Sequence, residues 1–179
     1  MKHIASLLIA VALSCSVSAQ QNGWRDRSGK PIPDTEARKS KDDFAGWLVV
    51  TSDTDWAEKW ATPSHVVPEF KEARTLTRNQ KAFVLIFFSN PKLSVEGRAD
   101  VLCDLRVTRP DGSNSIDQRD AVCFQGVISG APTNLYLSAP VIGFVGEPAD
   151  PIGTWVITVN LKDRLRGTAL PLKSSFTLQ

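Results

Sequence analysis

The sequence predicts a mainly β fold, an antiparallel β-sandwich of about six or seven strands with one short N-terminal helix. The first observation behind this prediction is a pair of alternating apolar and polar segments at the C-terminus, residues 153–161 and 168–178. The second is a series of apolar segments of strand length between residues 44 and 145, without the alternation of strand and helix that indicates a parallel sheet. The apolar share of 42% is enough to fill a core between two sheets.

The two C-terminal segments form the clearest hairpin. Their apolar side chains fall on one face of a period-2 pattern, interrupted by Ser174 alone: Trp155, Ile157, Val159 and Leu161 before the turn, and Leu170, Leu172, Phe176 and Leu178 after it. The turn, residues 162–167, is charged and ends in Gly167. Because one face of this hairpin is apolar, we expect the rest of the chain to supply a second layer.

Length and charge indicate one domain with tails and give no sign of a polyanionic partner. The chain has 179 residues, and its 21 basic and 19 acidic side chains nearly cancel. This balance gives no electrostatic reason to expect nucleic acid or an anionic membrane surface as a partner. We divide the chain into a signal peptide of residues 1–19, a flexible linker of residues 20–43 and a sandwich domain of residues 44–179.

The N-terminus predicts export to the periplasm or the medium. Lys2 precedes an apolar segment, residues 4–13, and the Val-Ser-Ala of residues 17–19 matches a small-residue cleavage motif before Gln20. An uncleaved anchor is one alternative, although the apolar segment is short for a membrane span. Lipidation at Cys15 is the other, although the preceding residues match a lipobox poorly. We therefore expect no stable membrane insertion after cleavage.

The predicted linker contains one residue out of keeping with the rest. Residues 20–43 are rich in glycine, proline and charge, and offer little apolar surface to offset the entropy of ordering. Trp24 is the exception. We interpret it as an incidental exposed aromatic; the alternative is an anchor that docks the tail or a partner.

The first half of the predicted domain contains a strand, a short helix and a second strand. Residues 44–52 form the first strand. The Asp-Thr-Asp of residues 53–55 offers an N-cap for a helix from Trp56 to Trp60, whose two indoles share a face. We expect these indoles to close one end of the core rather than to bind a ligand. Residues 81–88 are apolar throughout, which suits a strand covered on both faces.

The following strands are predicted to carry the disulfide. Residues 99–108 and 115–127 flank a Pro- and Gly-containing turn and would pair as a hairpin. Removal of the signal peptide leaves Cys103 and Cys123, which we expect to form a bridge between neighbouring strands in an oxidising compartment. Shorter strand segments follow at residues 135–137 and 141–145.

The closing hairpin resembles that of a known class of domain. The resemblance is to the terminal F–G hairpin of bacterial immunoglobulin-like and fibronectin type III-like domains, and it rests on the pattern Pro151-x-Gly153-x-Trp155-x-Ile157-x-Val159, a polar turn, then Leu170-x-Leu172 and Phe176. It implies an immunoglobulin-like sandwich. The cysteines depart from antibody-type domains, whose inter-sheet bridge spans much more chain. The resemblance therefore implies nothing about antibody-like recognition.

Residues for several kinds of catalysis are missing from the mature chain. His65 is its single histidine, which argues against Ser-His-Asp catalysis and against zinc. Five carboxylates do gather: Glu96, Asp100, Asp104, Asp117 and Asp120. They could serve a hydrolase or bind Ca²⁺, but interleaved arginines favour exposed ion pairs. We expect no cofactor and no metal site.

We expect a non-catalytic exported protein that binds another macromolecule, a protein by preference, as an accessory or assembly factor of the cell envelope. One alternative is a periplasmic inhibitor or immunity protein that blocks an enzyme with its loops; a carboxylate-based hydrolase is the other. Loops at the sandwich ends and the aromatic residues near them are the candidate binding sites. The residues that we single out are Trp56, Trp60, Tyr136, Phe144, Glu147 and Asp150.

Overall fold

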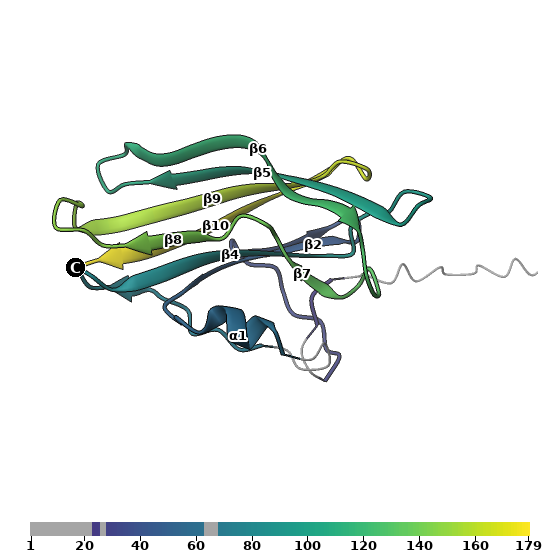
Figure 1. The fold of residues 1–179 in the computed structure, drawn as a ribbon, viewed down its shortest axis with the longest axis horizontal. Coiled ribbons are helices and arrows are strands. Elements are labelled where there is room, and N and C mark those ends of the chain that lie inside the picture. The colour runs from purple at the N-terminus through teal and green to yellow at the C-terminus, as the bar shows by residue number, and fades with distance from the viewer. Residues whose placement is uncertain (1–22, 26–27, 63–67) are drawn as a thin grey trace, which may run out of the picture.

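The computed structural model describes residues 23–25, 28–62 and 68–179 and confirms the predicted fold class. Two five-stranded sheets pack face to face as a β-sandwich, and the one helix is short (Figure 1). The predicted signal peptide, Cys15 and His65 lie outside the described residues. In the part of the chain that the structure describes, no helix is long and apolar enough to cross a membrane.

The first sheet has the order β1-β2-β4-β7, and β8 pairs with the other end of β4. All of its pairs are antiparallel. Its strands are β1 (Arg38–Lys41), β2 (Phe44–Thr51), β4 (Lys81–Ser89), β7 (Leu135–Leu137) and β8 (Ile142–Val145).

The second sheet has the order β3-β10-β9-β5-β6. Its strands are β3 (Thr75–Leu76), β10 (Thr168–Leu178), β9 (Gly153–Asp163), β5 (Arg98–Thr108) and β6 (Asn114–Val127). The predicted C-terminal hairpin is present as β9–β10, with Trp155 opposite Phe176 and Leu161 opposite Leu170. The short strand β3 adds to β10 in parallel.

Strand count and the N-terminal boundary differ from the prediction. Ten strands are present in the described residues, against the six or seven expected. Eight of them match strand segments named from the sequence, so the expected count was too low by itself; the other two are β1, whose Arg-Lys-Ser-Lys sequence has no apolar pattern, and β3, which has two residues. Strand β1 lies within residues 20–43, so the sheet begins before Phe44, inside the segment that the sequence assigns to a linker.

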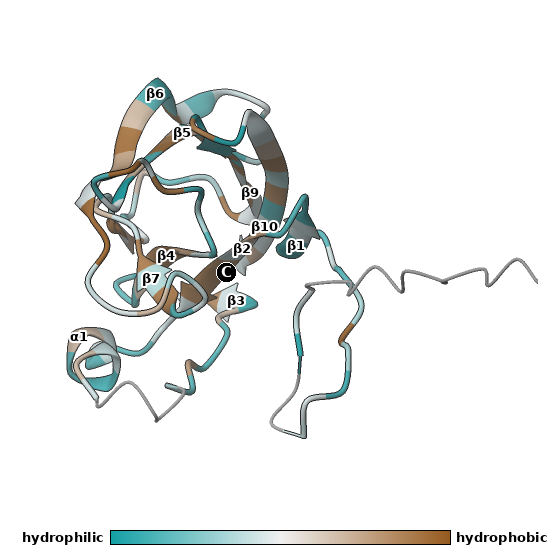
Figure 2. Ribbon diagram, turned by 90° about the vertical axis from the view of Figure 1, so that its right-hand side faces the viewer, coloured by the Kyte–Doolittle hydropathy of each residue, from teal (hydrophilic) through white to brown (hydrophobic). Residues whose placement is uncertain are grey.

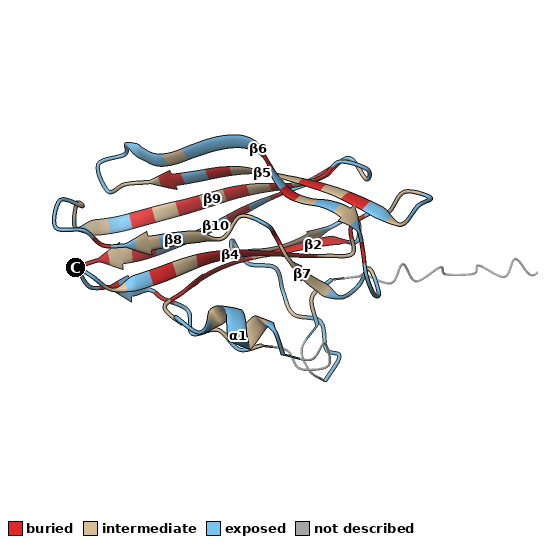
Figure 3. Cartoon of the chain, viewed as in Figure 1, coloured by how far each residue is buried: buried red, intermediate tan, exposed pale blue. Residues whose placement is uncertain are grey.

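The space between the sheets is filled by alternating side chains of both layers. Buried residues alternate with partly buried ones along most of β5 and β9, as Figure 3 shows. Trp155, Phe88 and Phe44 are among the largest fully buried side chains. Phe144 lies against Trp155 and Phe176, with ring centroids 5.0 and 4.8 Å away. This packing gives the sandwich its main core.

A second apolar cluster covers the outer face of the first sheet. Val49, Leu85 and Phe87 are buried there beneath partly buried aromatic residues. The helix α1 (Trp56–Trp60) lies outside this sheet beside β4 and β7, as a view along the strands shows (Figure 2). Strand β4 is therefore covered on both faces, as its uninterrupted apolar sequence predicts.

The position of the α1 indoles corrects the sequence-based interpretation. Trp56 packs on Phe83 and Trp60 on Phe87, with centroids 5.9 and 5.1 Å apart, so both lie on the outer face of the sheet and not at one end of the core. The physical reason is that β4 presents large apolar side chains on both faces, and the outer set needs a cover. Asp55 occupies the N-cap without a side-chain cap bond.

The side chain of Asp55 instead pairs with Lys59, which also pairs with Asp53.

At Gly46 the two sheets lie close together. A Cβ at this position would lie 2.9 Å from Leu161 Cδ2 and 3.2 Å from the Cδ1 atoms of both Leu170 and Leu172. We expect Gly46→Val to lower the free energy of unfolding by about 1–3 kcal/mol through overpacking. Denaturant unfolding of the variant measures this loss.

Gly143 in β8 provides the matched control, because nothing lies within 4 Å of a Cβ built there. Gly143→Val should leave stability almost unchanged. Equal losses for the two variants would show that the contact between the sheets is not what makes Gly46 necessary.

Candidate functional site

A groove of about 770 Å³ opens beside α1, at the end of the sandwich where β4 ends and β7 begins. We call it the aromatic groove. Its apolar lining comes from Trp24, Ala45, Trp60, Pro68, Leu135 and Tyr136. Its polar side chains are Arg25, Asp43, Thr62, Ser89, Asn90, Ser129, Thr133 and Asn134.

Three of the distant segments that line the groove carry its aromatic side chains. The N-terminal segment is fixed by Trp24, whose indole N–H donates to the carbonyl of Lys39 at 3.2 Å. The second segment is the end of α1. The third is the start of β7, which is fixed because Ser89 pairs with Leu135 across the sheet. The hydroxyl of Ser89 also donates to the carbonyl of Thr133 at 2.9 Å. The groove is therefore a product of the tertiary fold.

Trp24 is an anchor, and not the incidental exposed aromatic that the sequence favours. Its ring meets Trp47 of β2 edge to face at 6.3 Å, and the Arg38 guanidinium lies 5.8 Å from its centroid. A cation over an indole is attracted by the ring quadrupole. The N-terminal segment thus carries a residue that ties it to the first sheet.

Each groove aromatic is supported from behind by another ring. Trp24 rests on Trp47, and Trp60 rests on Phe87. Tyr136 stacks on Phe88, with centroids 5.6 Å apart. Support of this kind holds a ring in one orientation, so little side-chain entropy remains to be lost when a ligand binds.

Tyr136 brings a neutral hydroxyl to the groove. The hydroxyl donates to the carbonyl of Ala131 at 2.8 Å. Burial raises the pKa of Tyr136, because it disfavours the phenolate. The groove therefore presents an uncharged phenol at neutral pH.

The structure does not bring together at one site the six residues that we singled out from the sequence. Trp60 and Tyr136 line the aromatic groove, whereas Trp56 faces Phe83 and lies outside it. Phe144 is partly buried against the main core. Glu147 and Asp150 lie in the β8–β9 loop, at the opposite end of β4. Sequence reasoning gave Trp24 as an anchor only as the alternative and did not include it among the candidate binding residues.

Internal bonds tie down the loop that carries Glu147 and Asp150. The Arg78 guanidinium donates to the carbonyls of both residues. The Asp150 carboxylate accepts from the backbone N–H of Glu147 at 2.9 Å. The loop is thereby held in a fixed shape at the end of the sandwich opposite the groove.

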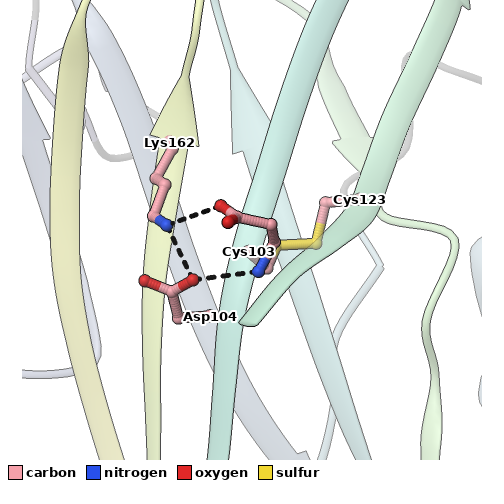
Figure 4. Close-up of a disulfide and its surroundings, with 5 residues drawn as sticks. Cys103, Asp104, Cys123 and Lys162 are labelled. Carbon is pink, nitrogen blue, oxygen red and sulfur yellow. Dashed lines mark hydrogen bonds and ion pairs between the residues drawn. A yellow bond between two sulfur atoms is a disulfide. The ribbon is translucent and has the colours of Figure 1, made fainter. Parts of the chain in front are cut away.

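The acidic residues lie on the solvent-facing side of the second sheet and form ion pairs there. Lys162 bridges Asp104 at 2.6 Å and Asp120 at 2.9 Å, directly beside the Cys103–Cys123 bridge (Figure 4). The other pairs are Asp100 with Arg164 and Asp117 with Arg106. These four carboxylates thus form ion pairs, which is the interpretation that the sequence favours over a hydrolase site.

The Asp104–Lys162 pair should make stability depend on pH. The hydrogen bond from Lys162 is the main factor that lowers the pKa of Asp104, and the same bond raises the pKa of Lys162. The contribution of Asp104 is present above its unfolded-state pKa and is lost as pH falls through its lowered folded-state pKa. The contribution of Lys162 is lost only as pH rises through its raised folded-state pKa.

We expect Asp104→Asn to remove a small part of the acid-side pH dependence, worth about 0.2–1 kcal/mol because both side chains are partly exposed. Unfolding midpoints between about pH 2 and 7 measure it, and added salt should shrink the difference between variant and parent. A difference that grows as pH falls would contradict the prediction.

No protein-family model matches the chain, and no curated protein matches its sequence. Among solved structures, a Niemann-Pick type C2 protein from the Japanese carpenter ant is 12% identical with a TM-score of 0.41, over 82% of this chain and 96% of that one. A family 123 glycoside hydrolase from Clostridium perfringens is 7% identical with a TM-score of 0.40, over 75% of this chain and 27% of that one.

The CARDB domain of a Pyrococcus furiosus protein is 7% identical with a TM-score of 0.38, over 82% of this chain and 97% of that one. At these identities and TM-scores, the three structures carry no argument about the function of this chain.

Proposed function

We propose that the protein is an exported, non-catalytic sandwich of the immunoglobulin-like type that binds another macromolecule of the cell envelope through the aromatic groove. The strand order supports the immunoglobulin-like assignment. With β9 and β10 as the F and G strands, β5 and β6 continue their sheet as C and C′, while β4 lies in the opposite sheet as B. An accessory or assembly factor is the role that suits such a domain.

The main observation that supports this function is the aromatic groove. It combines supported aromatic side chains with polar groups on its rim, which is the composition of binding sites and interface centres. The bridge between Cys103 and Cys123 fits an oxidising compartment, and so supports export. The pairing of the carboxylates with lysine and arginine supports a role without catalysis.

The inhibitor or immunity protein is a second candidate, favoured by the β8–β9 loop. The bonds from Arg78 hold this loop in one shape, and a rigid loop loses little entropy on binding an enzyme. The two candidates therefore use opposite ends of the molecule.

Site-specific photo-crosslinking in the producing cell tests both. A photoreactive residue at Thr133 would sit on the groove, and one at Glu147 would sit on the opposite loop; both side chains are exposed. Capture of one envelope macromolecule from Thr133 but not from Glu147 is the expected result. Capture of a single enzyme from Glu147 alone would replace the proposal with the inhibitor. Capture from neither position would refute both.

A further inference from the structure

We propose that the ligand of the aromatic groove is a neutral glycan chain. This inference rests on the proposed function and names the class of macromolecule bound at the same site. Three properties of the groove carry it: the supported rings, the kind of polar group beside them and the balance of charge.

The rings supply the platform that a sugar needs. A pyranose ring has a face of C–H groups, and the electron-rich face of an aromatic ring complements it. Trp60 is half-buried, since Phe87 covers one side of it and the groove lies on the other. Tyr136 adds a second ring that points its hydroxyl toward the loop at Ala131. Trp60, on the outer face of the first sheet, is therefore the ring that we assign to stacking on a sugar.

The polar groups on the groove are those that recognise hydroxyls. The amide of Asn134, the hydroxyl of Thr133 and the indole N–H of Trp60 make no side-chain hydrogen bond to another described residue. Amides and hydroxyls both donate and accept, as sugar hydroxyls do. The side chains of Asn134 and Thr133 are exposed on the rim, where a bound chain can reach them.

Two backbone carbonyls beside the groove are, in contrast, already used. The carbonyl of Pro132 accepts from the backbone N–H of Asn90 at 2.7 Å, and the carbonyl of Thr133 accepts from Ser89. A peptide that binds by adding a strand requires a row of free backbone groups. These two carbonyls are not open to a peptide, whereas the side chains of Thr133 and Asn134 remain open to sugar hydroxyls.

The charges of the groove balance. Arg25 and Asp43 are its one basic and one acidic lining residue, and the guanidinium of Arg25 already donates to the carbonyl of Gly29 at 2.8 Å. Nucleic acids and other polyanions select clusters of basic side chains. A balanced groove with aromatic rings fits an uncharged polymer.

Two tryptophans on the same helix give a matched pair of variants for the test. Trp60 lines the groove, whereas Trp56, four residues earlier, packs on Phe83 outside it. We would titrate the full mature chain with chitotetraose, cellotetraose and maltotetraose, and measure binding by calorimetry. At least one of these should bind, Trp60→Leu should weaken that binding at least about tenfold, and Trp56→Leu should change it less than about twofold.

Asn134→Ala keeps the test independent of folding, because this exposed amide contributes little to the core. It should weaken binding about three- to tenfold with an unchanged unfolding midpoint. Equal effects of the two tryptophan variants, or binding of none of the three sugars, would overturn the glycan inference. If Thr133 then captured a protein, the proposed function would stand without it; if Thr133 captured nothing, both would fail.

Discussion

Asp163→Ala is expected to lower the free energy of unfolding by roughly 3–5 kcal/mol, the range for removing one partner of a buried charged network. Asp163 has 1% of its surface exposed, at the end of β9. Its carboxylate accepts from the backbone N–H of Lys92 at 2.7 Å, and from the backbone and side chain of Arg166 at 3.0 and 3.3 Å. Alanine would leave these donors buried or half-buried without an acceptor.

The same network reaches the aromatic groove. The guanidinium of Arg166 also donates to the carbonyl of Asn90 at 2.9 Å, and the Asn90 amide donates to the carbonyl of Asp43 at 3.0 Å. Both Asn90 and Asp43 line the groove. Loss of Asp163 should therefore weaken groove binding as well as stability, under conditions where the variant is still folded.

Denaturant unfolding measures the stability loss, with two controls. Asp163→Asn retains the acceptor oxygen and should cost less than alanine. Asp117→Ala breaks an ion pair with Arg106 in which both side chains are more than 40% exposed, and should cost less than about 1 kcal/mol. A loss at Asp163 no larger than that at Asp117 would mean that the buried network adds nothing to stability.

The inward orientation of Asp163 could have been predicted from the sequence but was not. The apolar series from Trp155 to Leu161 advances by two residues, and Asp163 is the next member, so its side chain must face inward. In the sequence it lies within a charged segment, which we assigned to the turn. The period-2 pattern of the strand, rather than the charge of the residue, indicates which way Asp163 faces.

The strands and hairpins that are indicated by short sequence patterns could be predicted. The β9–β10 hairpin and the β5–β6 hairpin follow from alternation and turn residues, and β4 follows from its uninterrupted apolar sequence. Strand β1 was not predictable, because its pairing with β2 is determined by the backbone and its side chains show no pattern. Propensity gives little information on a polar edge strand.

The aromatic groove shows the same limit for function. Trp60 and Tyr136 were candidates because they are aromatic residues near predicted loops. That they line one groove with Trp24 depends on how α1, β7 and the N-terminal segment are placed around the first sheet, which no local pattern encodes. A site made from segments far apart in the sequence is visible only once the tertiary contacts are known.

Removal of the Cys103–Cys123 bridge should cost roughly 3 kcal/mol, the value that the chain-entropy model gives for a loop of about 20 residues. Both cysteines are fully buried, and the Cα atoms of the bridge are 5.8 Å apart. The bridge joins neighbouring strands around a bulge where their register shifts, between Cys103 and Leu105. It therefore holds the β5–β6 pair at a point where the ladder is interrupted.

Unfolding of the parent protein with and without a reducing agent isolates the bridge from any change in packing. The double variant Cys103→Ala/Cys123→Ala serves as the control, since its midpoint should not respond to the reducing agent. Its own loss should exceed that of the reduced parent, because alanine leaves a cavity where the sulfur atoms were. The denaturant slope should rise on reduction, as the unfolded chain expands. An unchanged midpoint in the reduced parent would show that the hairpin contacts alone hold the strands.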